Sequence, residues 1–563
     1  MITKKKQQNS VKSLFILVSI WVVGALCDRL WFWLDHSFLD WDQADYLNGV
    51  MNYWRALQTP QWFNGEWWRS FWLLSSKIPP LTYIATTPLF NFLGISHDSA
   101  TLFLLLCSAI LLISVYGLGV KLFNPSVGLW AAVLCQLLPG LYHYRLDFLL
   151  DYPLTAFVTL NFYLLTLWKL TEDNYMRTVN PPYSLLRSWS WAALFGISLG
   201  LALLLKQTTV MFLFLPIFWL LVDNIKRQRW QKISQLMAAL CLSIFVCGFW
   251  YRTNWLLILT SGKRATVDSA IAEGEPALHT IEAWTYYGKI LPYILSWHLL
   301  LVPIVGFLIY LIKKPQLLKK INLNSNWRWI AIFLLGGYLL SSLNMNKDAR
   351  YILPLLPVLS LVLAAGLLSW TGRWKSYIRW GTIGLALLLM LLNIFPLPGG
   401  GVTKILSPRT QHYPYMGQKW QHEKVVQEII NTSPYLTSTL GVLPSTSEIN
   451  QHNFSFYGGK SNYQVYGRQV GVREHEVEQD GRSLNWFITK TGEQGSIPSS
   501  QKAIVNLVEQ GGDFKLQNSW HLPDDSTLKL YHRKQASVEV KPISESIDKV
   551  RLDSVTLPEK TPP

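Results

Sequence analysis

The stretch YILPLLPVLSLVLAAGLLSW, residues 351–370, carries no charged side chain and is long enough to cross a bilayer as a helix. A second uncharged run, LVPIVGFLIYLI, covers residues 301–312. Of the 563 residues, 50% are hydrophobic and only 15% are charged, whereas soluble proteins are about a quarter charged. Long apolar runs in a chain with so few charges are typical of bilayer spans rather than of soluble core helices. We therefore predict a polytopic α-helical membrane protein.

Outward from that stretch, the apolar runs predict about 11 spans. They are expected at 13–34, 99–120, 127–142, 147–170, 189–205, 207–222, 234–260, 290–312, 328–343, 351–370 and 377–395. Many of the 27 Trp residues stand at the ends of these runs, where amphipathic rings prefer the headgroup level. The basic N-terminus resembles a signal peptide, but its apolar run continues to Leu34 without a small-residue cleavage site, so we expect an uncleaved first span.

The distribution of Lys and Arg predicts the orientation of the chain. With residues 1–12 in the cytoplasm, the cytoplasmic loops carry about twice as many basic residues as the opposite loops, as the positive-inside rule requires. This orientation places the loop 35–78 and the C-terminal third on the non-cytoplasmic face of a plasma membrane. The net charge of +16 is spread over short loops rather than gathered in one stripe, which argues against a nucleic-acid partner.

The five cysteines all lie in apolar segments, and no CxxC pair is present. This pattern indicates neither a disulfide framework nor a zinc site.

The chain changes character at the Pro398–Gly401 hinge, which predicts three regions after the first 12 residues. Residues 13–398 form the transmembrane domain, and within its outer loop we expect an amphipathic helix at 45–57. Residues 399–540 form a soluble mixed α/β domain, followed by a disordered tail over 541–563. In the soluble domain we expect a helix at 420–430 and strands at 440–443, 454–457, 486–489 and 528–531.

Ionisable residues within or beside membrane spans are costly, so they are candidates for function. Asp40, Asp42 and Asp45 follow the first span and could hold a divalent metal, or one of them could act as a general base; a solvated loop with a helix cap is the plainer alternative. Lys77 precedes a Pro-Pro turn and could grip a phosphate, or could extend to the membrane interface.

The remaining candidates lie at three later points on the same predicted face. Asp147 and Asp151 are four residues apart at the start of the fourth span, and either could instead pair with Arg145. Lys206 separates two apolar runs, and Arg350 is placed to grip a phosphate, unless it is an ordinary interfacial arginine. No Gly-rich phosphate loop or HExxH motif is present, so a soluble nucleotide site has no support.

Together these places resemble the GT-C membrane glycosyltransferases, particularly the protein O-mannosyltransferases and the aminoarabinose transferase of lipid A (glycosyltransferase families 39 and 83). The resemblance covers roughly residues 12–395 in order. The family's Asp-Glu-x-x-Tyr, Pro-Pro-Leu, Asp-x-Pro-Leu, Thr-Lys and Arg-Tyr-x-Leu-Pro motifs correspond here to Asp42–Tyr46, Pro79–Leu81, Asp151–Leu154, Leu205–Lys206 and Arg350–Pro354. Two positions depart from the pattern: Gln43 replaces the acidic residue after Asp42, and Ile78 separates Lys77 from the two prolines.

The resemblance implies an inverting transfer of a hexose or pentose from a polyprenyl-phosphate donor to a hydroxyl of a lipid, glycan or protein of the cell envelope. Asp42 would take the acceptor's proton, while Arg350 and Lys206 would receive the phosphate leaving group. The candidate site thus comprises Asp42 as the catalytic residue and, as substrate-binding residues, Tyr46, Lys77, Asp147, Asp151, Lys206, Lys347, Arg350 and Tyr351.

Two other classes of protein stay open at this point. A secondary transporter also places Asp and Lys in its spans, and a membrane-anchored binding protein would explain the C-terminal domain. Convergence of Asp42, Lys206 and Arg350 at the outer membrane face would favour the transferase, and their scatter at mid-depth would favour the transporter.

Overall fold

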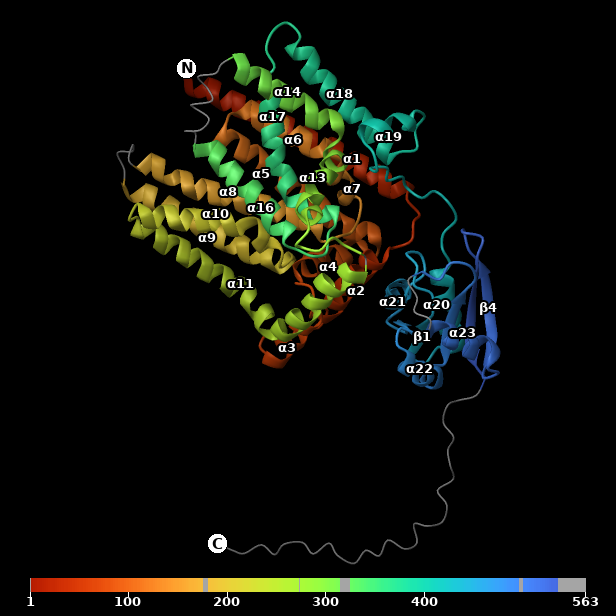
Figure 1. Ribbon diagram of the computed structural model, residues 1–563. Helices are drawn as coiled ribbons and strands as arrows, with labels where there is room; N and C mark the ends of the chain where they lie inside the picture. Colours follow the sequence, from red (N-terminus) through yellow and green to blue (C-terminus); the bar gives the residue numbers. More distant parts are fainter. Residues whose placement is uncertain (1, 176–180, 273, 314–324, 496–499, 535–563) are drawn as a thin grey trace, which may run out of the picture. The chain divides into compact units, whose positions relative to one another are not determined.

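The computed structural model describes residues 2–175, 181–272, 274–313, 325–495 and 500–534. The chain divides into two compact units, Met1–Lys419 and Trp420–Pro563 (Figure 1). The predicted disordered tail, 541–563, lies outside the described residues.

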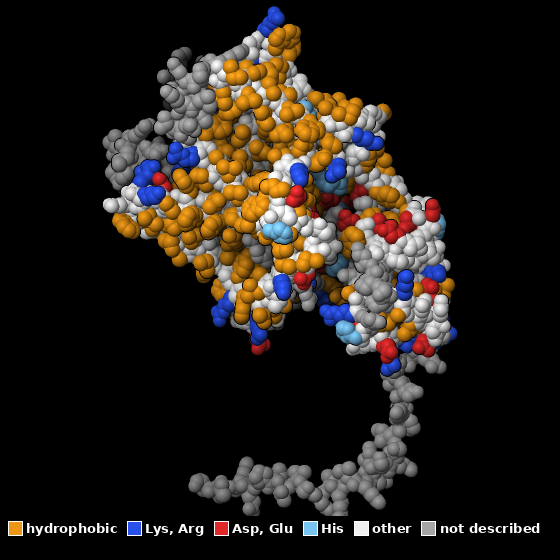
Figure 2. All heavy atoms as spheres, viewed as in Figure 1, with side chains coloured by type: hydrophobic (Ala, Val, Ile, Leu, Met, Phe, Trp, Pro, Cys, Tyr) orange, Lys and Arg blue, Asp and Glu red, His pale blue; other side chains and the backbone are white. Residues whose placement is uncertain are grey.

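The first unit is a bundle of helices, eight of which are long and apolar enough to cross a membrane within the described part of the chain. They are α1 (Ile2–Leu34), α5 (His97–Leu122), α8 (Asp151–Tyr175), α9 (Pro181–Leu205), α10 (Thr209–Lys226), α11 (Trp230–Lys263), α17 (Leu356–Leu368) together with residues 349–355 before it, and α18 (Lys375–Ile394). Figure 2 shows hydrophobic side chains over much of the visible surface of this unit. Such a surface belongs in lipid rather than in water.

Two further predicted spans are bent helix pairs, which raise the number of spans to as many as 10. Helices α6 (Pro125–Leu137) and α7 (Pro139–Arg145) meet at 58°, because Pro139 lacks the N–H that would continue the helix. Helices α13 (Ile281–Leu295) and α14 (Trp297–Lys313) meet at 102°, where Ser296 has a φ of 72°. The predicted span 328–343 is the helix α16 (Ser325–Ser342), which is not among the candidate spans. The polytopic helical fold is therefore confirmed, and the described residues contain 8–10 candidate spans where the sequence suggested about 11.

Close helix packing in this bundle depends on small residues. A methyl group built on Gly119 of α5 would lie 2.3 Å from the Cα atom of Gly128 on α6. A methyl group on Gly196 of α9 would lie 2.4 Å from the carbonyl oxygen of Ala239 on α11. Backbones can approach this closely in a membrane only where side chains are absent or small.

The first outer loop is helical and carries the candidate catalytic residue. It folds into α2 (Trp41–Ala56) and α3 (Gly65–Leu73), and α4 (Leu81–Leu93) follows the Pro79–Pro80 turn. The predicted helix at 45–57 is thus present but begins earlier, at Trp41. Asp40 occupies the N-cap position, so Asp42 stands in the first turn and is not the helix cap. A short 3₁₀ helix, η2 (Ala349–Leu355), carries Arg350 into α17.

The segment after the last candidate span stays with the first unit up to Lys419. It contains η3 (Gly400–Val402), α19 (Thr403–Leu406) and an extended run that returns to α1. The N–H of His412 donates to the carbonyl of Asn393 (2.8 Å), the N–H of His36 donates to the carbonyl of Tyr415 (2.7 Å), and the N–H of Tyr415 donates to Asp35 (2.7 Å). The second compact unit consequently starts at Trp420, whereas the hinge in the sequence suggested Gly399.

The second unit is a five-stranded sheet flanked by helices. The strand order is β2-β1-β3-β5-β4; β1 runs parallel to β2 and β3, and β5 runs antiparallel to β3 and β4. The strands are β1 (Ser438–Val442), β2 (Val465–Gln469), β3 (Trp486–Lys490), β4 (Phe514–His521) and β5 (Thr527–Arg533). The helices are α20 (His422–Thr432), α21 (Gln451–Lys460), α22 (Val477–Ser483) and α23 (Ser500–Gln510), with a short η4 (Glu474–Glu476).

One predicted strand of this unit is wrong. Residues 454–457 lie within the helix α21, although Phe454, Phe456 and Tyr457 suit a strand. The helix begins with a capping box, in which the Asn450 side chain accepts from the N–H of Asn453 and the Asn453 side chain accepts from the N–H of Asn450. That local cap outweighs the strand preference of the aromatic residues.

Candidate functional site

The candidate base and the candidate phosphate ligand form an ion pair. Arg350 Nη1 lies 2.8 Å from Asp42 Oδ2, which joins η2 to the first turn of α2. Arg350 Nε lies 2.8 Å from Asp348 Oδ2, and the Arg350 N–H also donates to Asp348. The guanidinium is therefore fixed between two carboxylates, whereas the Asp42 side chain is 47% exposed and can be reached from solvent.

A second ion pair lies beside the first. Lys206, in the turn between α9 and α10, places its Nζ 2.6 Å from Oδ1 of Asp151, the first residue of α8. Asp151 is buried, and its place in the first turn of a helix suits a negative charge.

Tyr351 connects the two pairs. The Lys206 ammonium lies 5.1 Å from the centre of the Tyr351 ring, and the Arg350 guanidinium carbon lies 5.7 Å from it. Residues from four separate parts of the chain thus meet: Asp42 from α2, Asp151 from α8, Lys206 from the α9–α10 turn and Arg350 from η2. Asp42, Lys206 and Arg350 therefore converge and are not scattered through the bundle.

The other predicted site residues occupy different surroundings. Tyr46 is buried, and burial raises the pKa of its hydroxyl well above the usual value. The Lys77 side chain is exposed, and its backbone carbonyl accepts from Gln207. Lys347 is buried: its Nζ donates to the carbonyl of Ser342 (2.6 Å) and lies 5.6 Å from the ring centre of Tyr287, and burial lowers its pKa.

The structure corrects the suggestion that Arg145 pairs with Asp147 or Asp151. Arg145 is buried and binds Asp28 of α1 at 2.7 Å, and it also donates to Gln136. Asp28 was missed, although a carboxylate inside the first span is the signal that could have revealed it. This pair joins α1 to α7 and is structural.

Asp147 lies instead next to Gln43 and His412. Gln43 Nε2 donates to Asp147 Oδ1 (3.3 Å), and Gln43 Oε1 accepts from the N–H of Phe148 (3.2 Å). His412 Nε2 lies 3.5 Å from Asp147 Oδ1. Burial raises the pKa of Asp147 to about 6 and lowers that of His412 to about 4. Gln43, which departs from the family motif, thus serves to hold Asp147.

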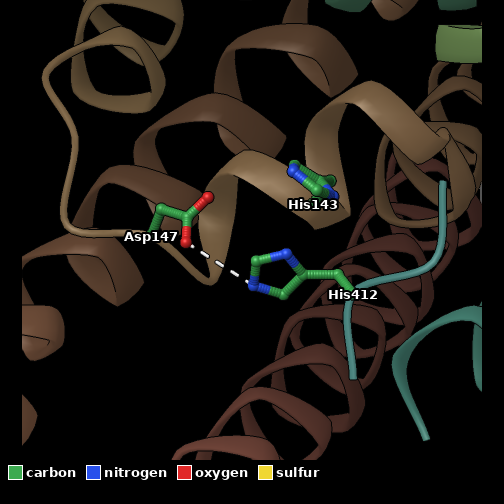
Figure 3. A group of neighbouring side chains, drawn as sticks. All are labelled: His143, Asp147 and His412. Carbon is green, nitrogen blue, oxygen red and sulfur yellow. Dashed lines mark ion pairs between the residues drawn. The ribbon is translucent and has the colours of Figure 1, made fainter. Parts of the chain in front are cut away.

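Within the described residues, one group of three side chains could hold a metal ion: His143, Asp147 and His412 (Figure 3). Asp40 and Asp42, where the sequence suggested a divalent metal, do not belong to it. The Asp42 carboxylate is already bound by the Arg350 guanidinium, whose positive charge disfavours a cation at the same oxygen. The metal suggested near Asp40 and Asp42 stays a prediction from the sequence.

The fold is shared with solved membrane glycosyltransferases. ArnT from Cupriavidus metallidurans in the apo state matches with a TM-score of 0.54 and 12% identity over 93% of this chain and 98% of that chain. The same protein bound to undecaprenyl phosphate matches with a TM-score of 0.55 and 11% identity over 94% and 98%. The Archaeoglobus fulgidus oligosaccharyltransferase with a tethered acceptor peptide matches with a TM-score of 0.51 and 12% identity over 84% and 69%. The chain therefore has the GT-C fold, as its motifs suggested.

A family model matches part of the chain. Residues 77–251 match the model of the family described as dolichyl-phosphate-mannose-protein mannosyltransferase. The matched region contains Lys77, Asp147, Asp151 and Lys206. No curated protein matches the sequence.

Proposed function

We propose that this chain is a membrane glycosyltransferase that moves a sugar from a polyprenyl-phosphate donor to an acceptor hydroxyl. The observation that carries the proposal is the meeting of the Asp42–Arg350 and Lys206–Asp151 pairs around Tyr351. The match of residues 77–251 to a mannosyltransferase family model supports the type of reaction. The neighbour solved with undecaprenyl phosphate supports a lipid-phosphate donor.

Two cations are placed to receive the donor's phosphate. When the sugar–phosphate bond breaks, the phosphate gains negative charge and needs no proton if positive groups already face it. The Arg350 guanidinium can bind two phosphate oxygens at once, and the Lys206 ammonium adds a second charge. Tyr351 lies against both cations and limits where they can move.

Asp42 is placed to act as the general base. In the structure its carboxylate accepts from Arg350, so phosphate binding to Arg350 would release it toward an acceptor hydroxyl. The acceptor oxygen then bonds to the anomeric carbon as the bond from that carbon to the phosphate oxygen breaks, and the acceptor proton passes to Asp42. Attack opposite the leaving phosphate in one step inverts the anomeric centre.

The reaction is assigned to the non-cytoplasmic face of the plasma membrane. The Lys and Arg bias supports an orientation with α2 and the C-terminal unit on that face and the N-terminus in the cytoplasm. Lipid, glycan and protein hydroxyls are all acceptable in this chemistry, and so are hexose and pentose donors.

A comparison of cells with and without the gene tests the proposal. Mass spectrometry of envelope glycolipids, glycans and glycoproteins should show one sugar modification lost in the deletion, together with a rise in the matching polyprenyl-phosphate sugar. Identical sugar profiles with altered uptake of a small solute would contradict the proposal and favour a transporter.

A further inference from the structure

Two imidazoles and one carboxylate converge beside the proposed active site. His143 belongs to α7, Asp147 follows it by four residues, and His412 comes from the extended run after α19. One ligand atom of each residue lies within 4.8 Å of those of the other two. Figure 3 shows Asp147 and His412 facing each other, with His143 next to them. The chain thus brings His412 next to His143 and Asp147. The proposed sugar transfer uses none of these three side chains.

Neighbouring side chains hold two of these groups in place. The Trp31 ring stacks on the His412 ring, with the ring centres 4.9 Å apart and the planes at 25°. The Trp31 indole N–H also donates to the backbone carbonyl of His412 (2.9 Å). Gln43 donates to Asp147 Oδ1 while bound to the backbone of Phe148. Supporting bonds of this kind orient the ligands of metal sites.

The third group has an unused ligand atom. Nδ1 of His143 is buried and has no hydrogen-bond partner among the described residues. A buried polar nitrogen without a partner is costly, and a bound cation would satisfy it. The Asp147 and His412 side chains are only 14% and 20% exposed, so both are largely shielded from solvent.

We propose that His143, Asp147 and His412 bind one divalent transition-metal cation of the zinc class. Two imidazole nitrogens and one carboxylate oxygen suit Zn²⁺ and its transition-metal neighbours better than Mg²⁺ or Ca²⁺, which prefer oxygen ligands only. Three protein ligands leave a fourth position for water or another small oxygen ligand. The cysteine pattern argued only against a zinc site made of cysteines. The ligands proposed here are histidine and aspartate.

The bound cation would join three parts of the first unit. It would fasten the run containing His412 to α7 and, through Asp147 and Gln43, to the start of α2. Since Gln43 follows Asp42 directly, the cation would order the turn that carries the candidate base. This role is one of positioning, and metal binding itself does not depend on the proposed transferase activity.

Metal binding by the full-length protein in detergent tests the proposal. The protein is stripped with a chelator and dialysed against Zn²⁺, and bound metal is counted by elemental mass spectrometry. We expect one tightly bound Zn²⁺ per chain in the wild type and loss of that ion in His143→Ala and His412→Ala. Gln43→Ala should weaken binding by about 10-fold, as removal of an outer hydrogen bond does. The controls His36→Ala and His279→Ala change exposed histidines of the same unit and should bind like the wild type.

A variant that retains a metal ligand covers the case in which the alanine variants fail to fold. Loaded with Co²⁺, the wild type should show visible bands of a four-coordinate ion, and His412→Cys should add a thiolate-to-cobalt charge-transfer band. Zn²⁺ binding that is absent from the wild type, or that is unchanged in both alanine variants, would overturn the proposal. A Co²⁺ spectrum of His412→Cys without the thiolate band would also overturn it.

Discussion

Asp147 and Asp151 lie four residues apart, yet their surroundings differ. Asp151 is buried and binds Lys206 at 2.6 Å, next to Tyr351 and Arg350. Asp147 contacts Gln43 and His412 instead. Of these two carboxylates, therefore, only Asp151 orients a cation that is proposed to receive the phosphate.

We expect Asp151→Asn to lower sugar transfer far more than Asp147→Asn. The first change removes the anion that holds Lys206 beside Tyr351 and should cost on the order of 100-fold in turnover. In protein from which metal has been removed, Asp147→Asn should lower turnover by several-fold at most. Product formation by chelator-treated variants measures both effects, and equal small losses would assign both carboxylates to structure alone.

At the residue scale, the sequence singled out the four residues of the two ion pairs, but it predicted neither the pairing nor the neighbouring side chains. Asp42, Asp151, Lys206 and Arg350 stand in short motifs whose order resembles a known family. His412 carries no such motif, and its approach to Asp147 depends on a chain return that no local pattern specifies. The alternative in which Arg145 pairs with Asp147 or Asp151 is wrong, because the partner of Arg145 is Asp28 on another span.

At the scale of elements, the Asp28–Arg145 pair joins α1 to α7 in the interior of the bundle. Both side chains are 2% exposed. Removal of one partner from such a pair leaves an uncompensated buried charge, which costs about 3–5 kcal/mol. We expect Asp28→Leu to lower thermal stability in detergent strongly.

The double variant Asp28→Leu with Arg145→Met is the matched control, because it removes both charges. It should recover most of the lost stability, since an apolar pair of similar volume replaces a buried ion pair at little cost. A double variant as unstable as the single one would show that the pair is not the reason for the loss.

His422, at the start of α20, makes the stability of the second unit depend on pH. Its ring is buried, stacks on Tyr457 and bonds to the Glu448 carbonyl at 2.7 Å. Burial lowers the pKa of His422 from 6.5 to about 4, so between these values the unfolded state binds more protons than the folded state. We therefore expect the stability of the second unit to be complete above pH 6.5 and to fall by roughly 3 kcal/mol as the pH drops toward 4.

Urea unfolding of the fragment 420–534 between pH 7 and pH 4 measures this effect. His422→Gln should flatten the pH dependence, whereas His475→Gln changes an exposed ring and should leave it as in the wild type. If the fragment with His422→Gln kept the full pH dependence of its unfolding free energy, groups other than His422 would cause the acid sensitivity.

At the same scale, helices were easier to predict than their ends and bends. Apolar runs placed the spans, since twenty uncharged residues have few alternatives to crossing a bilayer. The 102° bend after Leu295 depends on a positive φ at Ser296, a residue type that gives no such signal. The strand expected at 454–457 failed because the Asn450–Asn453 cap selects a helix.

For the whole molecule, we expect the N-terminus to lie in the cytoplasm and the second unit to lie on the opposite side of the membrane. Single cysteines at Lys12 and Arg482, introduced into a cysteine-free version, report on the N-terminus and the second unit, because both side chains are exposed. A membrane-impermeant thiol reagent added to intact spheroplasts should label Arg482→Cys and spare Lys12→Cys until the cells are lysed. Labelling of Lys12→Cys alone would show an inverted topology and remove the assigned face of the site.

The most direct measurement for the account as a whole is the rate of sugar transfer by Asp42→Asn. Asn keeps the shape of Asp and can still accept from Arg350, but it cannot take the acceptor's proton. In deletion cells expressing the variant at wild-type level, mass spectrometry should show the lost sugar modification returning at least about 100-fold more slowly than with the wild type. Glu66→Gln, an exposed carboxylate in the same outer loop, should restore the modification at the normal rate. Near wild-type transfer by Asp42→Asn would contradict the assignment of Asp42 as the base.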